Sequence, residues 1–224
     1  ERNTNAEDSN LPMLAILIPL ILTIAISVGG GPSAADLFAG EKEKKTMEAL
    51  LMTPVNRSTL LVAKYLTIAS VGIIIGFVTL VVVAIEIAFF TENLKAAVNF
   101  NGNTGAVLTV GTLVMVIYSL FVASILTITS ILGKTVKEAQ SYSMPIMMLT
   151  VFPIMMLTGL GVNEFATKHF ILPFVNIFAI ITELLFGIVD YSHLLVTSLS
   201  NIAIIIILLI ASRIMFAKDK WVLD

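Results

Sequence analysis

Residues 65–85 have the sequence YLTIASVGIIIGFVTLVVVAI, a run of 21 residues without a charged side chain. Lys64 precedes this run and Glu86 follows it. An α-helix rises about 1.5 Å per residue, so about 20 consecutive apolar residues are needed to cross the hydrocarbon core of a bilayer. The run therefore predicts a membrane-spanning helix bounded by charges at both ends.

The composition of the whole chain agrees with this prediction. Of its 224 residues, 58% are hydrophobic and 12% are charged, and the mean hydropathy is +1.01. Soluble domains carry about 25% charged residues, and so much apolar surface would aggregate in water. The chain has no cysteine, and its two histidines lie 24 positions apart, so neither a thiolate nor a paired-histidine metal site is expected. The net charge is −2 without a dominant basic block, which gives no reason to expect a nucleic-acid partner.

Four more charge-free runs predict spans. The five predicted spans are residues 11–28, 65–85, 106–133, 139–163 and 194–212. Between the last two, the charge-free stretch 170–182 has only 13 residues, with Pro173 inside it and Glu183 directly after it. This length is too short to cross a bilayer and favours a re-entrant or interfacial pair of short helices over residues 170–188.

The placement of lysine and arginine tests this topology, because these residues concentrate in short cytoplasmic loops. With five spans and an external start, ten of them face the cytoplasm and three, Arg2, Lys95 and Lys168, face outside. A sixth span at 170–188 would move Arg213, Lys218 and Lys220 outside, so it is rejected. An external start without a signal peptide also leads us to expect one more helix upstream of Glu1.

The longest predicted cytoplasmic stretch, residues 29–57, contains a short amphipathic pattern. Met47, Leu50, Leu51 and Pro54 repeat at helical spacing, with Pro54 as the helix end. Glu41 and Lys45 stand in the favourable i,i+4 order for an ion pair. These residues alone allow two interpretations, a helix lying on lipid headgroups or a docking element for a cytoplasmic partner.

A family resemblance rests on this stretch. Residues 41–55, EKEKKTMEALLMTPV, resemble the signature that follows the second transmembrane helix of ABC type-2 transporter permeases. The resemblance is closest to NatB-like sodium exporter permeases. Residues 63–65 (AKY), 137–140 (KEAQ), 172–176 (LPFVN) and 183–187 (ELLFG) resemble further family motifs in the same order. The resemblance covers nearly the whole chain.

The resemblance implies an all-α membrane fold, in which residues 1–224 form one permease domain. Its parts are an external stub at 1–10, a cytoplasmic coupling region at 30–58 and an external re-entrant region at 164–193. One helix and a large external domain would precede Glu1. Residues 134–140 would form a second, smaller cytoplasmic contact. The residues that would couple to the ATPase subunit are Glu41, Glu43, Thr46, Glu48, Leu51, Pro54, Lys137 and Glu138.

Few charged or amide side chains lie in or near the predicted spans. Those that could line a pathway or an external gate are Glu86, Asn176, Glu183 and Asp190. A carboxylate rim could attract an exiting cation, although solvated loops and interhelical hydrogen bonds explain the same residues. No catalytic residue and no metal site are predicted, and an intramembrane enzyme is disfavoured because the spans contain no acid or base at depth.

The chain has no G-x-x-x-x-G-K-[ST] loop, and Gly133-Lys134-Thr135 is interpreted as a helix end. ATP and Mg²⁺ would therefore be bound by a partner ATPase subunit, with no cofactor in this chain and a second permease copy completing the pathway. The predicted function is Na⁺ export across a prokaryotic plasma membrane by a multi-pass subunit. The alternatives are export of drugs, peptides or lipids, and a membrane anchor or sensor that does not transport.

Overall fold

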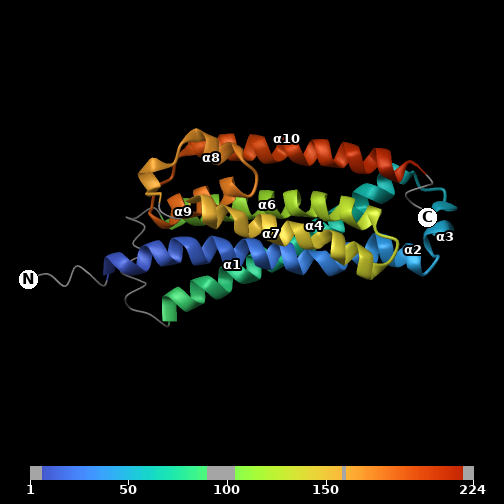
Figure 1. Ribbon diagram of the computed structural model, residues 1–224, viewed down its shortest axis with the longest axis horizontal. Helices are drawn as coiled ribbons and strands as arrows, with labels where there is room; N and C mark the ends of the chain where they lie inside the picture. Colours follow the sequence, from blue (N-terminus) through green and yellow to red (C-terminus); the bar gives the residue numbers. More distant parts are fainter. Residues whose placement is uncertain (1–6, 90–103, 158–159, 219–224) are drawn as a thin grey trace, which may run out of the picture. The chain divides into compact units, whose positions relative to one another are not determined.

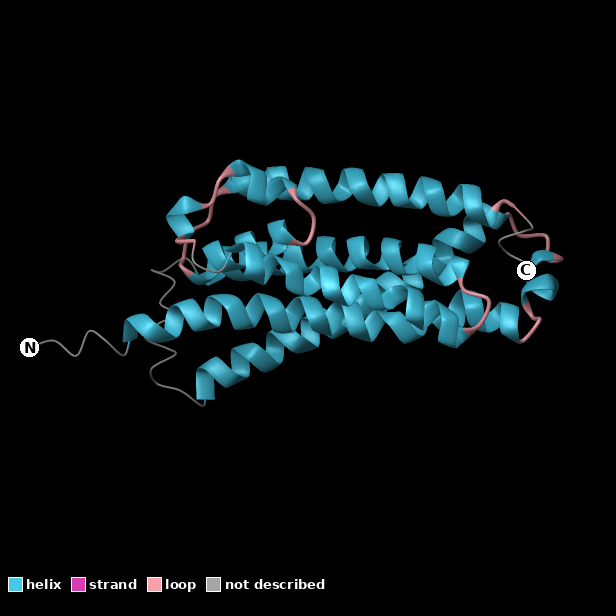
Figure 2. Cartoon of the chain, viewed as in Figure 1, coloured by secondary structure: helices cyan, strands magenta, loops and turns pink. Residues whose placement is uncertain are grey.

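The computed structural model describes residues 7–89, 104–157 and 160–218, and these residues form helices joined by short loops (Figure 1). No strand is present in these three ranges (Figure 2). The predicted all-α class is therefore confirmed. The elements are α1 (Glu7–Ala35), η1 (Asp36–Gly40), α2 (Glu41–Glu43), α3 (Met47–Leu51), α4 (Arg57–Phe89), α6 (Thr104–Leu132), α7 (Val136–Leu157), η2 (Val162–Glu164), α8 (Thr167–Ile171), α9 (Val175–Leu185) and α10 (Tyr191–Phe216).

Four helical segments are long and apolar enough to cross a membrane. They are Leu14–Glu43, Arg57–Glu86, Gly105–Leu132 and Tyr191–Ala217. Each overlaps one of the predicted charge-free runs, and all four extend past it on at least one side, since helix caps lie in the polar flanks. Asn56, for example, accepts a hydrogen bond from the Ser58 N–H at 3.1 Å and so caps the start of α4.

The predicted span at residues 139–163 corresponds to α7, and its predicted end at residue 163 is wrong. The helix ends at Leu157, and Val162–Glu164 form a separate 3-10 turn. α7 has 22 residues, a rise of about 33 Å, which is long enough to span. It is nevertheless less apolar than the four segments above, because Ser141, Tyr142 and Ser143 lie in it. The count of five spans therefore stays a prediction.

Two short helices occupy the region predicted as a re-entrant pair. α8 has five residues and α9 has eleven, and Phe174 joins them with a φ of 66°. α9 ends in a Schellman motif, in which Gly187 adopts a φ of 73° and the Ile188 N–H donates to the Glu183 carbonyl at 2.9 Å. The helix pair is present, while its position relative to a bilayer remains a prediction.

The chain divides into two compact units, and each takes sections of α1, α4, α6, α7 and α10. The first unit comprises Glu1–Ala25, Gly76–Tyr118 and Leu149–Asn201, and it contains α8 and α9. The second comprises Ile26–Ile75, Ser119–Met148 and Ile202–Asp224, and it contains η1, α2 and α3. Every described lysine or arginine predicted to be cytoplasmic belongs to the second unit, whereas Lys168 belongs to the first. Arg2, Lys95 and Lys220 lie outside the described residues.

Candidate functional site

The predicted coupling region begins as a direct continuation of α1. The helix passes through the π-helical segment η1 into α2 and then breaks at Lys44 and Lys45, where Lys45 has a φ of 56°. The chain resumes as the five-residue α3. The prediction of one amphipathic helix from Glu41 to Pro54 is therefore wrong, and of its apolar positions Met47 is the buried one, at 2% exposure.

Glu41 turns towards α4. Its carboxylate forms an ion pair with Lys64, whose ammonium group also donates to the Leu37 carbonyl. The Lys64 ammonium lies 4.9 Å from the centre of the Phe38 ring. The predicted pair of Glu41 with Lys45 is wrong, because the helix breaks before the i,i+4 geometry is complete. Lys64 is 5% exposed, so this lysine fixes the position of α2 on α4 instead of anchoring the helix in headgroups.

Lys42 turns towards the end of α6. Its ammonium group donates to the carbonyl oxygens of Ile131 at 2.6 Å and Gly133 at 3.3 Å. The last carbonyls of a helix lack partners within the helix and carry its partial negative charge. A lysine ammonium at this point satisfies them and neutralises that charge.

Glu43 turns towards the start of α7. Its carboxylate accepts a hydrogen bond from the Val136 N–H at 2.9 Å, which is one of the unpaired donors at that helix end. Thr135 caps the same helix, since its hydroxyl oxygen accepts from the Glu138 N–H at 3.2 Å. Gly133, Lys134 and Thr135 thus connect α6 to α7, which confirms their interpretation as a helix end.

Glu138 closes the same connection. Its carboxylate accepts hydrogen bonds from the Tyr142 hydroxyl at 2.7 Å and the Lys134 N–H at 2.9 Å. These bonds hold the pKa of Glu138 below its usual range. The carboxylate therefore stays ionised at neutral pH and is engaged within its own chain.

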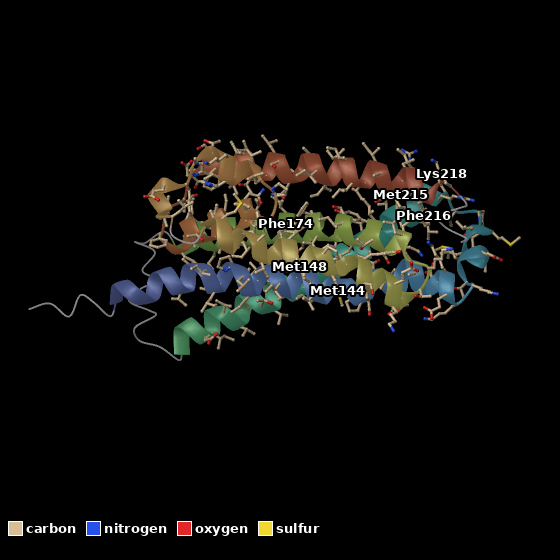
Figure 3. All side chains as sticks on the ribbon, viewed as in Figure 1. Met144, Met148, Phe174, Met215, Phe216 and Lys218 are labelled. Carbon is tan, nitrogen blue, oxygen red and sulfur yellow. The ribbon has the colours of Figure 1, made fainter. Side chains whose placement is uncertain are left out.

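Small residues bring α7 close to α1 and η1. Ala35, Ala39 and Ala139 form one buried cluster, and Val136 packs against it. A Cβ atom at Gly133 would lie 2.7 Å from the Ala139 Cβ, so glycine is required there. Phe38 also meets Phe216 of α10 edge to face, with 5.8 Å between ring centres. Figure 3 labels Phe216 at the end of α10, after Met215. The second unit is thus assembled around η1 and α2.

The remaining predicted coupling residues are mostly exposed. Thr46, Glu48, Pro54 and Lys137 are exposed, and Leu51 is half-buried. Two apolar residues next to them were missed by sequence reasoning, Met52 with 88% exposure and Val55 with 52%. Both stand outside the spans and present apolar surface, which is a feature of partner-binding surfaces. Their position directly after α3, in a short segment that has no hydrophobic core of its own, was the feature from which their exposure could have been expected.

The first unit contains the predicted gate residues. Glu183 on α9 is 5% exposed, and its carboxylate lies 2.9 Å from the His193 Nδ1 atom of α10. The same histidine ring stacks on Phe170 of α8 at 3.9 Å between ring centres. Asp190 caps α10 by accepting a hydrogen bond from the Ser192 N–H at 2.8 Å, and its carboxylate lies 3.8 Å from His193. Glu183 and Asp190 thus lie close together at His193, a residue that sequence reasoning did not select.

Asn176 and Glu86 are in different environments from this cluster. Asn176 in the first turn of α9 is fully buried, and both polar atoms of its side chain lack a hydrogen-bond partner among the described residues. Glu86 is exposed on α4 and makes no contact with Glu183 or Asp190 in the part of the chain that the structure describes. The structure does not assemble the four predicted gate residues into one site.

Comparison with known proteins identifies the family of this chain. A family model described as "ABC-2 family transporter protein" matches residues 2–221. The chain belongs to the ABC-2 transporter family. It is also 37% identical over 211 residues to the ABC transporter permease protein NatB of Bacillus subtilis (strain 168). That alignment covers 94% of this chain and 55% of NatB, so the chain spans about half the length of that relative. No solved structure matches the chain significantly. The predicted family resemblance is confirmed.

Proposed function

We propose that this ABC-2 chain is the permease part of an ATP-driven exporter, and that an ATPase subunit docks on α3 and the residues after it. The observation that carries the proposal is the attachment of an exposed segment to a short helix that is bonded to three other helices. α3 and residues 52–55 are largely exposed, while the adjoining α2 is bonded to α4, α6 and α7. A partner that moves α3 therefore acts on three long helices through one short element.

The exposed residues suit a docking surface of mixed character. Met52 and Val55 present apolar side chains, and Glu48 presents a carboxylate beside them. Interfaces of this kind combine an apolar centre with a polar rim. Lys137 at the start of α7 is exposed as well, which supports residues 134–140 as the second contact.

Na⁺ is the proposed substrate, exported across the prokaryotic plasma membrane. The motifs at residues 41–55 and 137–140 resemble those of NatB-like sodium exporter permeases, and the similarity to NatB supports the same assignment. Export of drugs, peptides or lipids by the same fold is the second candidate, because the described residues contain no cluster of His, Asp or Glu suited to a metal ion.

The complete transporter would contain two permease copies and two ATPase subunits that bind ATP and Mg²⁺. α7 supports a second copy, because it exposes Met144 and Met148, both labelled in Figure 3. Met144 is 63% exposed and Met148 is 80% exposed, and the two lie one turn apart. Methionine side chains adapt to irregular partner surfaces.

The function is tested with the full-length permease and its ATPase subunit expressed together in sodium-sensitive cells. We expect ATP-dependent efflux of radioactive sodium, and we expect Glu48→Lys to reduce co-purification of the ATPase subunit. Lys168→Glu reverses an exposed charge in the first unit and serves as the matched control. Efflux of a drug with unchanged sodium efflux would exclude Na⁺ as the substrate, and unchanged co-purification of the Glu48→Lys variant would exclude the docking surface.

A further inference from the structure

We propose that Glu41, Lys42 and Glu43 form an internal transmission node that moves α4, α6 and α7 together when α3 is displaced, and that these residues do not themselves contact the ATPase subunit. This inference rests on the proposed function and changes the role that the family resemblance implies for Glu41 and Glu43.

The first argument is the direction of the three side chains. Consecutive residues of a helix point about 100° apart, so a single helical turn can reach three neighbours. Glu41 binds Lys64 of α4, Lys42 binds the carbonyls of Ile131 and Gly133, and Glu43 binds the Val136 N–H. Each residue of the triplet thus holds a different long helix, and its charged group is already used inside the chain.

The second argument is that two of these bonds are made to backbone atoms. The carbonyls that Lys42 binds close α6, and the N–H that Glu43 binds opens α7. Only residues 133–135 separate these two helices. Because the triplet holds both sides of this short connection, displacement of α2 moves the end of α6 and the start of α7 as one piece.

The third argument is the tight link between α2 and α3. The Lys45 N–H donates to the Lys42 carbonyl at 2.9 Å, and the Thr46 N–H donates to the Glu41 carbonyl at 2.9 Å. α3 begins at the next residue, Met47, whose side chain is buried. The turn therefore allows α2 and α3 little independent movement, and a displacement of the exposed α3 also displaces α2.

The fourth argument is the π-helical segment before α2. η1 spans Asp36–Gly40 and joins α1 to α2 without ending the helix. Such segments occur mainly as single turns within α-helices and are frequent at functional sites. Here η1 offers α2 a point of reorientation that leaves the spanning part of α1 in place.

The test separates docking from transmission in the full-length permease with its ATPase subunit. Lys42→Met keeps the length of the side chain without its charge, Glu43→Gln keeps the shape of the side chain, and Lys42→Arg keeps the charge. The docking variants Glu48→Lys and Met52→Ser serve for comparison. For each variant we measure the affinity for the ATPase subunit, the rate of ATP hydrolysis, and the number of ions exported per ATP hydrolysed.

We expect Lys42→Met and Glu43→Gln to bind the ATPase subunit as the wild type does but to export about tenfold to hundredfold fewer ions per ATP, which corresponds to the loss of a hydrogen bond to a charged group. Lys42→Arg, which keeps the charge, should export as many ions per ATP as the wild type. Glu48→Lys and Met52→Ser should instead weaken binding and leave the ratio unchanged. Hydrogen exchange at the Val136 amide should become faster in Glu43→Gln, because that N–H loses its charged acceptor.

Two results would overturn the inference. One is a loss of affinity in Lys42→Met equal to that in Glu48→Lys, which would make the triplet part of the docking surface. The other is an unchanged export ratio in Lys42→Met and Glu43→Gln. Failure of the proposed function is distinguishable, because the wild-type pair itself would then neither bind nor transport. If Lys42→Met or Glu43→Gln fails to fold, its thermal unfolding profile shows this, and the export measured for the other of these two variants decides the outcome.

Discussion

Replacing His193 by phenylalanine should lower the free energy of unfolding of the permease by about 1.5–3 kcal/mol, the range for a hydrogen bond to a charged group. The bond in question joins the His193 Nδ1 atom to the Glu183 carboxylate at 2.9 Å. Both side chains are largely shielded from water, with exposures of 24% and 6%. Phenylalanine retains the stacking on Phe170, so the variant removes the polar contact alone.

Two further variants separate the contributions of the hydrogen bond and of the ring stacking to the free energy of unfolding. His193→Ala also removes the stacked pair of rings, which adds about 0.5–1.5 kcal/mol. Glu183→Gln removes the charge and keeps an oxygen that can accept the hydrogen bond. In a double-mutant cycle, His193→Phe and Glu183→Gln should show a coupling energy of about 1 kcal/mol or more, since the two residues are in direct contact.

The measurement is unfolding of the purified full-length permease in detergent, followed by far-ultraviolet circular dichroism and repeated with hydrogen exchange on α9. His193→Phe should accelerate exchange in α9, because its buried Glu183 then lacks its partner. A free energy of unfolding within about 0.5 kcal/mol of the wild type, the usual range for surface substitutions, would refute a stabilising role of this pair.

Three further predictions concern single sites. Lys45→Gly should stabilise the second unit by up to about 1 kcal/mol, because Lys45 has a φ of 56° and glycine adopts such values without strain; thermal unfolding measures this. Gly133→Ala should destabilise by about 1–3 kcal/mol, because the added Cβ would lie 2.7 Å from Ala139. In intact cells, Lys168→Cys should react with a membrane-impermeant thiol reagent, whereas Lys137→Cys should react only after the cells are opened.

The controls use other positions of the same kind. Gly31→Ala places a Cβ with nothing within 4 Å, so in a helix it should be neutral or stabilising. Lys45→Val should destabilise, since a β-branched residue is strained at a positive φ. Loss of stability in Gly31→Ala equal to that in Gly133→Ala would contradict the steric reasoning. Labelling of Lys168→Cys only in opened cells would contradict the predicted topology.

The long helices were largely predictable, because absence of charge over about 20 residues is a direct consequence of the bilayer as solvent. The same criterion failed at the end of α7, where residues 160–163 are also uncharged but do not belong to the helix. Absence of charge does not distinguish an uncharged loop from an uncharged helix. Helical periodicity likewise predicted one helix over residues 41–54, whereas bonds to three other helices hold α2 and the chain then turns.

Partners distant in sequence account for most of what was missed. Glu41 and Lys64 lie 23 residues apart, and the pattern around Lys64 indicated a lysine flanking a span. Lys42 and Glu43 bind backbone atoms about 90 residues further along the chain. The sequence does not reveal a hydrogen bond to a helix end, because the backbone group that takes part in it does not depend on the type of residue. Glu183 was predicted as a candidate gate residue, but its partner His193 is recognisable only once α9 and α10 are placed together.

α9 has a consequence for how the protein is made. All eleven of its residues are buried, including the polar Asn176 and Glu183. With a length of about 16 Å, it is too short for the insertion machinery to release into lipid as a span of its own. α9 packs against α8, lies next to Gly111 of α6, contacts His193 of α10 through Glu183, and donates a hydrogen bond from Thr182 to the Ala15 carbonyl of α1 at 3.1 Å. During synthesis α9 must therefore wait until α10, which is translated after it, has entered the membrane.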